Sequence, residues 1–293
     1  MIPRTGLPIK PAYPARFKPL AGVRVLSVAL NLPGPMALGR LRALGADVYK
    51  IEPPAGDPMR RMCAPLYRAM HRGVVVHMLD LKSAAGQAGL QEQLGPSDLL
   101  ITSFRPAALA RLRLGSRHLA QAYPRLSVVS IVGQRGHSAQ VPGHDLTYQA
   151  GADLVDTARL PSTLLADMTG ALLTVEAAMG AVLQSRRDGR GARVQVALAD
   201  AAAYAAVPRL AGLTSPGGIL GGALPNYGVY ACGDGLVAIA ALEPHFAAAL
   251  ADAAGGSTRK AIARWCRAHN ASELQAIATA WDLPLHAWVH AAH

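Results

Sequence analysis

Blocks of apolar residues separated by polar turns predict a strand–helix–strand unit near the start of the chain. Residues 20–30 are apolar and β-branched with few polar breaks, which is typical of a buried parallel strand. A proline-containing turn at 31–35 leads to a helical stretch at 36–44, and residues 46–52 favour a second strand. Because such a unit crosses over with right-handed chirality, we expect the two strands to be parallel.

The same alternation continues to about residue 200. Further segments are predicted as strands at 73–80, 98–102 and 126–132, helices at 82–94 and from 169 to about 187, and a strand leading into a helix at 192–200. Ser83 is expected to cap the first of these helices. Strands that alternate with helices predict an α/β sheet covered by helices on both faces.

The last third of the chain predicts a second, smaller α+β domain. After a Gly/Pro-rich stretch, the pattern indicates a β-hairpin with a Gly-Asp-Gly turn at 233–235, a helix from about residue 243, and short helices within 256–293. The predicted organisation is a flexible extension at 1–19, a large Rossmann-like domain with a parallel sheet at 20–210, a linker at 211–224, and a small domain at 225–293.

The charge of the chain points to an anionic ligand. The formal net charge is +11 at pH 7 and the isoelectric point is near 10.1, which favours a polyanionic partner or a generally cationic surface. The basic residues are scattered, aromatic residues make up only 5%, and the chain has no nucleic-acid recognition motif of the zinc-finger, RRM or KH type. A small molecule that carries phosphate explains the charge excess equally well, as does in part an Arg-rich and Ala-rich background composition, and no nucleic-acid partner is expected.

Bulk features also limit the compartment. Cys63, Cys232 and Cys266 are odd in number and widely spaced, which argues against a disulfide framework or a cysteine zinc site and favours a reducing cytoplasm. The first residues lack the apolar segment of a secretory signal, and we find no uninterrupted apolar run long enough to span a bilayer. A cytoplasmic protein with no membrane partner and no bound metal is expected.

One His/Asp pair carries the candidate chemistry. His144 follows a Pro-Gly turn and precedes a carboxylate, Asp145, and Asp167 stands where an N-cap or first-turn residue of the long Ala/Leu-rich helix belongs. Backbone N–H groups at a helix start can hold a developing oxyanion. Local pattern alone favours a simpler interpretation, in which Asp167 is only a cap and His144 only a loop histidine.

An ordered series of motifs, from about residue 20 to 245, resembles the family III CoA-transferases, which also contain the α-methylacyl-CoA racemases. The motifs are LAGVRVL at 20–26, PGP at 33–35, LGADVYKIEPP at 44–54, GDP at 56–58, LDLKS at 79–83, SDLLITSFRP at 97–106, YPRLSVVSIVG at 123–133 and ARVQVALAD at 192–200. A single motif of this kind is weak, whereas the series in the right order is specific.

This resemblance implies an acyl-CoA substrate and a homodimer, in which the two chains interlock. It implies CoA contacts from Arg105, with Arg72 and Lys50 as weaker candidates. The first predicted turn lacks the G-x-G-x-x-G fingerprint, so neither a nicotinamide nor a flavin cofactor is expected. Arg111 and Arg113 are expected to lie on a solvated helix face.

The leading hypothesis is racemisation or epimerisation at the α-carbon of a 2-methylacyl-CoA. Removing the α-proton of a thioester needs a base, a group that stabilises the enolate, and a second group that returns a proton on the opposite face. His144 and Asp167 are predicted to be that pair, and N–H groups near Met168 are predicted to hold the oxyanion. The resemblance further implies that Glu243 pairs with His144; otherwise Glu243 complements a helix dipole.

Two alternatives remain open. In CoA transfer, Asp167 alone would attack the thioester, form an anhydride and then an aspartyl-CoA thioester, and pass CoA to another carboxylate. In a non-catalytic CoA-binding homologue, departures from the family pattern would have removed activity. Thr102 stands where the family tends to have glutamate, and Ala107 and Thr169 stand where glycine is usual.

Overall fold

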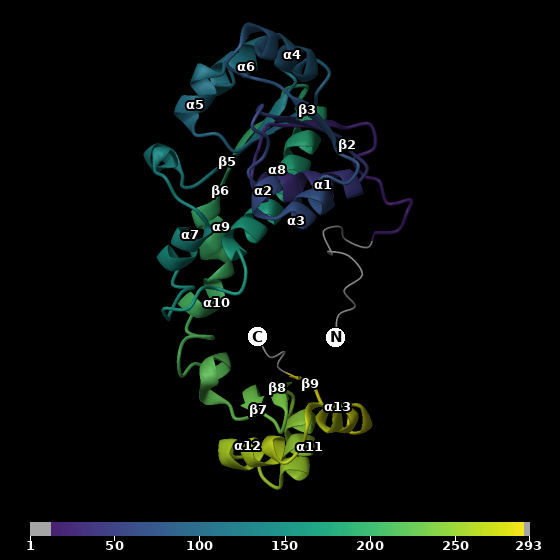
Figure 1. Cartoon of the computed structure of the whole chain (residues 1–293), viewed down its shortest axis with the longest axis vertical. Helices are drawn as coiled ribbons and strands as arrows, with labels where there is room; N and C mark the ends of the chain where they lie inside the picture. The colour runs from purple at the N-terminus through teal and green to yellow at the C-terminus, as the bar shows by residue number, and fades with distance from the viewer. Residues whose placement is uncertain (1–12, 290–293) are drawn as a thin grey trace. The chain divides into compact units, whose positions relative to one another are not determined.

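The computed structural model of the chain describes residues 13–289, which form two compact units (Figure 1). The large unit ends at Ala206 and the small unit begins at Val207. This boundary precedes the stretch 211–224 that was predicted as a linker, and part of that stretch folds as a short π-helix, η2 (Ile219–Ala223). Residues 1–12 of the predicted extension lie outside the described residues.

The large unit is built on a parallel sheet, as the strand–helix pattern predicts. Its strand order is β3-β2-β1-β4-β5-β6, and every neighbouring pair runs parallel. The strands are β1 (Arg24–Ser27), β2 (Asp47–Glu52), β3 (Val75–Met78), β4 (Leu99–Thr102), β5 (Ser127–Val132) and β6 (Arg193–Ala197). All residues of β4 are buried, because a central parallel strand is covered on both faces.

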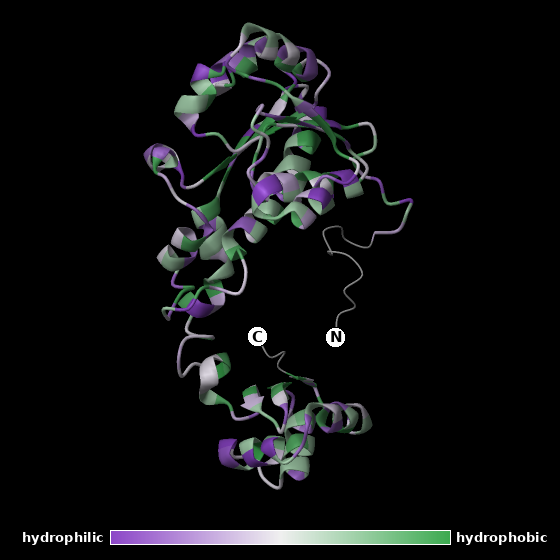
Figure 2. Cartoon of the chain, viewed as in Figure 1, coloured by the Kyte–Doolittle hydropathy of each residue, from purple (hydrophilic) through white to green (hydrophobic). Residues whose placement is uncertain are grey.

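Helices cover both faces of this sheet (Figure 1). One core cluster joins α1 and α8 to the sheet, and another joins α4, α5 and α6 to its opposite face; the strands between them are coloured as hydrophobic in Figure 2. The bounds are α1 (Pro33–Ala43), α2 (Met59–Met62), α3 (Ala64–Met70), α4 (Ala84–Leu94), α5 (Pro106–Arg111), α6 (Ser116–Ala122), α7 (Asp145–Gly151), α8 (Leu165–Asp188) and α9 (Leu198–Ala205). Ser83 caps α4 as predicted, because its side chain accepts from the Gly86 N–H.

Helix α8 is the one described helix that is long and apolar enough to cross a membrane, judged by length and composition. In this structure it packs against α1, α9 and β5. Residues such as Ala171, Ala178 and Val182 are buried on it. Its apolar composition is therefore explained by its place in the core of the large unit.

The strand order places a topological switch point between β1 and β4, because the chain proceeds outward from β1 in one direction and then returns to β4. In open α/β sheets, ligands bind outside the carboxyl ends of the strands at such a point. The turn after β1, the turn after β4, and the segment after β5 with a 3₁₀ helix, η1 (Gly136–Gln140), all lie at this edge.

The small unit packs helices against a three-stranded antiparallel sheet. Its elements are α10 (Val207–Leu210), β7 (Tyr227–Ala231), β8 (Gly235–Ala240), α11 (Pro244–Ala254), α12 (Arg259–Arg267), α13 (Ala271–Ala280) and β9 (Leu285–Val289). The hairpin and helices match the prediction. The two short helices predicted within 256–293 correspond to α12 and α13, whereas β9, which pairs with β8, was not predicted.

Two helical glycines offer a matched stability test. A Cβ at Gly86 would overlap the backbone carbonyl of Asp80, whereas a Cβ at Gly180 would meet nothing within 4 Å. Gly86→Ala should therefore destabilise the protein by about 1–3 kcal/mol. Gly180→Ala should stabilise it by about 0.5–1 kcal/mol, because alanine loses less backbone entropy in a helix. Urea denaturation measures both, and equal effects would contradict the close packing of Gly86.

Candidate active site

A cavity of about 250 Å³ lies at the switch point of the large sheet. Residues after β1 and β4 and at the end of β5 form its walls, including Asn31, Phe104 and Gly133. His144 and Asp167 also line it. The two residues that the sequence singled out therefore face one cavity within the large unit.

Helix α8 places Asp167 at the cavity. The helix begins at Leu165, earlier than the sequence pattern indicated, so Asp167 lies in its first turn. Its backbone N–H donates to Asp145 Oδ1 at 2.9 Å. Burial, assisted by the negative charge of Asp145, raises the pKa of the Asp167 carboxyl from 3.8 to about 7. Asp167 can therefore both accept and donate a proton near neutral pH.

Asp145 connects the start of α7 to the start of α8. Its side chain is buried, and its Oδ2 accepts from Gln149 Nε2. Gln149 Nε2 also donates to the Thr163 carbonyl at 3.1 Å, just before α8. The sequence suggested Asp145 only as a neighbour of His144, whereas its contacts show that it holds the backbone of Asp167.

His144 is the residue that precedes α7, where its backbone is extended at φ −140° and ψ 168°. The His144 N–H donates to Thr147 Oγ1 at 3.2 Å, and Thr147 Oγ1 donates back to the His144 carbonyl at 2.8 Å. These bonds fix the backbone at the helix start. The imidazole is exposed and lines the cavity.

Tyr148 is a site residue that the sequence analysis missed. It is buried and lines the cavity. Burial, together with the charge of Asp167, raises the pKa of its hydroxyl, and Arg105 opposes that shift. A Cβ at Gly133 or at Gly143 would overlap the Tyr148 hydroxyl, so both glycines leave room for it. Proximity to two glycines distant from each other in sequence was the only signal, and it needs the fold to be seen.

Basic side chains lie at the cavity and beside it. Arg105 is the N-cap residue of α5, is exposed, and lines the cavity. A second cavity of about 780 Å³ shares Phe104 with the first and is lined by Lys82, Arg111 and Arg113. Both arginines are exposed, as expected for solvated side chains, and both also border this hollow, Arg111 at the end of α5 and Arg113 just after it.

Arg72 does not line the first cavity, and Glu243 lies in the small unit. Arg72 is exposed in the turn after α3 and does not line that cavity, so its predicted phosphate contact stays a prediction. Glu243 lies in the small unit as the N-cap residue of α11, where its carbonyl accepts from the Ala247 N–H at 2.9 Å. Its predicted pairing with His144 also stays a prediction.

Two predicted contacts need correction. The Met168 N–H already donates to the Leu164 carbonyl at 3.0 Å, because α8 starts early enough to include it in the helical ladder; it is not a free oxyanion donor. The Lys50 side chain is 0% exposed and forms ion pairs with Glu52 and Asp57. A fully buried and paired ammonium does not face a phosphate of a bound CoA.

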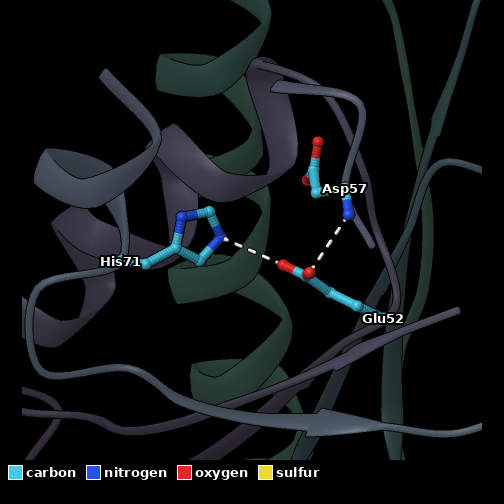
Figure 3. A group of neighbouring side chains, drawn as sticks. All are labelled: Glu52, Asp57 and His71. Carbon is cyan, nitrogen blue, oxygen red and sulfur yellow. Dashed lines mark hydrogen bonds and ion pairs between the residues drawn. The ribbon is translucent and has the colours of Figure 1, made fainter. Parts of the chain in front are cut away.

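Lys50 also lies among three side chains that are spaced closely enough to be metal ligands. In the part of the chain that the structure describes, ligand atoms of Glu52, Asp57 and His71 lie within 4.8 Å of one another (Figure 3). The Lys50 Nζ lies 3.0 Å from Glu52 Oε1 and 2.8 Å from His71 Nε2. The ammonium thus supplies the positive charge of this cluster, and a metal ion would have to displace it.

The raised pKa of Asp167 predicts a pH-dependent loss of stability. The unfolded chain ionises this carboxyl near 3.8, whereas the folded state keeps its proton up to about pH 7. The stability from the protonated form is fully present below the unfolded pKa and is lost as the pH rises through the folded pKa. Asp167→Asn should match wild type near pH 4 and exceed its stability at pH 8 by up to about 4 kcal/mol. Urea denaturation at both pH values measures this, and equal stabilities at pH 8 would contradict it.

Comparison with known sequences adds relatives to this geometry. The family model for CoA-transferase family III matches residues 20–291. The chain is 30% identical over 251 residues to the alpha-methylacyl-CoA racemase of Mus musculus, covering 79% of this chain and 63% of that protein. It is 30% identical over 210 residues to a succinate–glutarate CoA-transferase of Agrobacterium fabrum, covering 64% of this chain and 52% of that protein. The chain thus spans about half to two thirds of the length of these relatives.

Solved structures show the same fold. A CaiB/BaiF family protein from Brucella suis superposes with a TM-score of 0.79 at 22% identity, covering 94% of this chain and 85% of that one. The hypothetical protein Rv3272 from Mycobacterium tuberculosis gives a TM-score of 0.77 at 24% identity, covering 92% and 85% of the two chains. At identities of 22% and 24%, the likeness shows a shared fold alone.

Proposed function

Because this chain belongs to CoA-transferase family III, we propose that it racemises or epimerises the α-carbon of a 2-methylacyl-CoA, with His144 and Asp167 as the proton-transfer pair. The observation that carries this proposal is that both side chains line one cavity in which the Asp167 pKa is raised to about 7. A proton shuttle needs a group that is half-protonated near working pH, and Asp167 is such a group.

The proposed reaction moves one proton off and one proton on. The base, His144 or Asp167 according to the starting enantiomer, removes the α-proton, and the electron pair of the C–H bond forms an enolate. The other residue then donates its proton to the opposite face, which inverts the carbon. The next turnover runs in reverse or follows proton exchange with water, so the pair is regenerated without any co-reactant.

The enolate oxygen needs a donor, and Tyr148 offers one. Tyr148 lines the cavity, and burial and the Asp167 charge raise the pKa of its hydroxyl further above neutral pH, so it is present as a proton donor. It therefore replaces the Met168 amide as the proposed oxyanion donor. The walls are apolar where Leu30, Ile131 and Leu198 contribute, and the volume near 250 Å³ suits a short 2-methylacyl group.

The two adjoining cavities offer a place for the whole thioester. With the acyl group beside Asp167, the pantetheine arm would pass Phe104 and the nucleotide would lie in the second cavity. Lys82, before the start of α4, and Arg111 and Arg113, at the end of α5 and just after it, line that cavity and would meet the CoA phosphates. The positive net charge of the chain is consistent with such a ligand. The homodimer and the cytoplasmic location implied by the resemblance stay predictions.

Isotope exchange tests the proposal. Incubation of the protein with (S)-2-methylbutanoyl-CoA in D₂O, with no acceptor acid present, should give a product that carries one deuterium at the α-carbon and both configurations there. Mass spectrometry and chiral chromatography of the hydrolysed acid measure the two outcomes. Binding of CoA with neither exchange nor transfer would instead support a non-catalytic homologue.

CoA transfer is the second candidate, because most of the curated relatives are named as CoA-transferases. In that reaction the Asp167 carboxylate attacks the thioester carbonyl and CoA thiolate leaves, which produces an acyl-aspartyl anhydride. The thiolate then attacks the aspartyl carbonyl and releases the first acid, and the acceptor acid reverses these steps. Trapping of an aspartyl-CoA adduct on Asp167, without α-deuteration, would favour this candidate.

A further inference from the structure

The turn between β1 and α1 forms one wall of the cavity through Leu30 and Asn31. Asn31 has φ +67°, a left-handed conformation that asparagine tolerates better than most residues other than glycine and that its surroundings help to hold. Two hydrogen bonds hold this turn. The Leu30 N–H donates to Ser103 Oγ at 3.2 Å, and the Asn31 N–H donates to Asp57 Oδ1 at 3.2 Å.

Hydrogen bonds and an ion pair hold both carboxylate oxygens of Asp57 and its backbone N–H. It is only 1% exposed. Its Oδ1 also accepts from the Met59 N–H at 2.9 Å, and its Oδ2 pairs with Lys50 Nζ at 2.5 Å. Its own N–H donates to Glu52 Oε2 at 3.1 Å. The carboxylate that receives the Asn31 N–H therefore has little freedom to move.

Lys50 is the centre of this arrangement. Its ammonium has three protons, and three acceptors surround it: Glu52 Oε1, Asp57 Oδ2 and His71 Nε2. His71 Nδ1 lies 2.7 Å from the Tyr67 carbonyl, which assigns its proton to Nδ1 and leaves Nε2 to accept from Lys50. Figure 3 shows the three acceptor residues converging from β2, the loop after it and the end of α3.

We propose that Asp57, held by Lys50, is a positioning residue that fixes the Leu30–Asn31 turn at the wall of the substrate cavity. This inference rests on the proposed function for the ligand that the turn would contact, an acyl-CoA. The chain of contacts runs from the buried ammonium through one carboxylate to one backbone amide. Lys50 and Asp57 thereby act on the substrate through Asn31 and touch no reacting atom.

A purely structural role for this cluster predicts a different result from a positioning role. In that case, removing any member of the cluster would destabilise the large unit as a whole and would not increase hydrogen exchange at the Leu30–Asn31 turn in particular. Tyr67 provides the matched control, because its hydroxyl donates to Glu52 Oε1 at 2.9 Å and so belongs to the same buried cluster. Tyr67→Phe removes that bond but leaves the Lys50–Asp57–Asn31 connection intact.

The experiment compares wild type, Asp57→Ala, Asp57→Asn and Tyr67→Phe in two readouts, each at a temperature well below the variant's midpoint of unfolding. Calorimetric titration with 2-methylbutanoyl-CoA, whose acyl group would lie beside the turn, gives the Kd. Hydrogen–deuterium exchange of the free proteins reports on the peptide that contains Asn31. Asp57→Asn keeps the shape and an acceptor oxygen, but it exchanges a charge-assisted bond for a weaker neutral one.

Asp57→Ala is expected to raise the Kd for 2-methylbutanoyl-CoA about tenfold, which corresponds to about 1.4 kcal/mol. Asp57→Asn is expected to raise it about threefold, and Tyr67→Phe to change it less than twofold. Exchange at Asn31 should accelerate in both Asp57 variants and not in Tyr67→Phe. If Asp57→Ala does not fold, Asp57→Asn decides by the same two readouts.

Equal Kd values and equal exchange for the Asp57 variants and Tyr67→Phe would overturn the positioning role. If wild type does not bind 2-methylbutanoyl-CoA, the proposed function fails, whereas the exchange readout still tests whether Asp57 holds the turn. Faster exchange at Asn31 in the Asp57 variants alone would then support the positioning role without the substrate. The two proposals can therefore fail independently.

Discussion

Asp167→Asn is expected to lower turnover by about 10²–10⁴-fold while the protein still binds CoA. Asparagine keeps the size of the side chain and the backbone bond to Asp145, but it can neither accept a proton nor attack a thioester. Both enzymatic candidates need the carboxyl, so this loss is expected under either. The rate of α-deuteration of (S)-2-methylbutanoyl-CoA in D₂O and the rate of CoA transfer to an added acceptor acid measure it, alongside the Kd for CoA.

Glu176→Gln is the control for that prediction. It makes the same change of a carboxyl to an amide on the same helix, α8, at an exposed position outside the cavity. Its turnover should stay within about twofold of wild type, as expected for a surface change away from the site. Substantial turnover in Asp167→Asn would remove Asp167 from the reaction and leave the cavity without its proposed acid–base group.

The sheet could be predicted because its signals are local. Residues 98–102 and 126–132 are short apolar runs bounded by turn residues, and such runs are typical of buried parallel strands. The first-turn position of Asp167 was also local, since it precedes a long Ala- and Leu-rich stretch. The switch point then followed from topology, and with it the edge at which the cavity lies.

The environment of Lys50 could not be predicted in this way. A lysine within a strand that ends at two prolines looks like a basic residue at a sheet edge. Its burial depends on Asp57 and His71, which reach it from a loop and a helix end that local pattern does not place. Only the assembled fold shows that three acceptors meet one ammonium and that a buried charge is thereby compensated.

The role of Tyr148 in the site was missed because it depends on contacts between residues that local sequence pattern does not bring together. Tyr148 follows His144 on the next turn of chain, yet nothing in the pattern distinguishes it from a core tyrosine. Its role depends on Gly133 and Gly143, which must both lack a Cβ for its hydroxyl to fit. The prediction for the Met168 amide was wrong because of a local boundary. The helix starts a few residues earlier than predicted, so the Met168 N–H is already hydrogen-bonded within the helix.

His144→Ala is expected to separate the two enzymatic candidates. Racemisation needs a proton donor and an acceptor on opposite faces, so loss of the imidazole should slow α-deuteration about 10²–10⁴-fold. CoA transfer through Asp167 needs no second proton carrier at the α-carbon, so a transferase should retain its rate with an added acceptor acid. The measurement is the ratio of α-deuteration to CoA transfer in wild type and variant.

His137→Ala is the matched control, because His137 is an exposed histidine on η1 that does not line the cavity. It should leave both rates near those of wild type, whereas His144→Ala should slow α-deuteration and leave any CoA transfer unchanged. If both histidine variants keep wild-type deuteration, the base opposite Asp167 must come from another residue of the cavity wall. Tyr148→Phe, which removes a hydroxyl whose pKa is raised by burial and the Asp167 charge, should by contrast slow deuteration through loss of the proposed oxyanion donor and not through loss of a base.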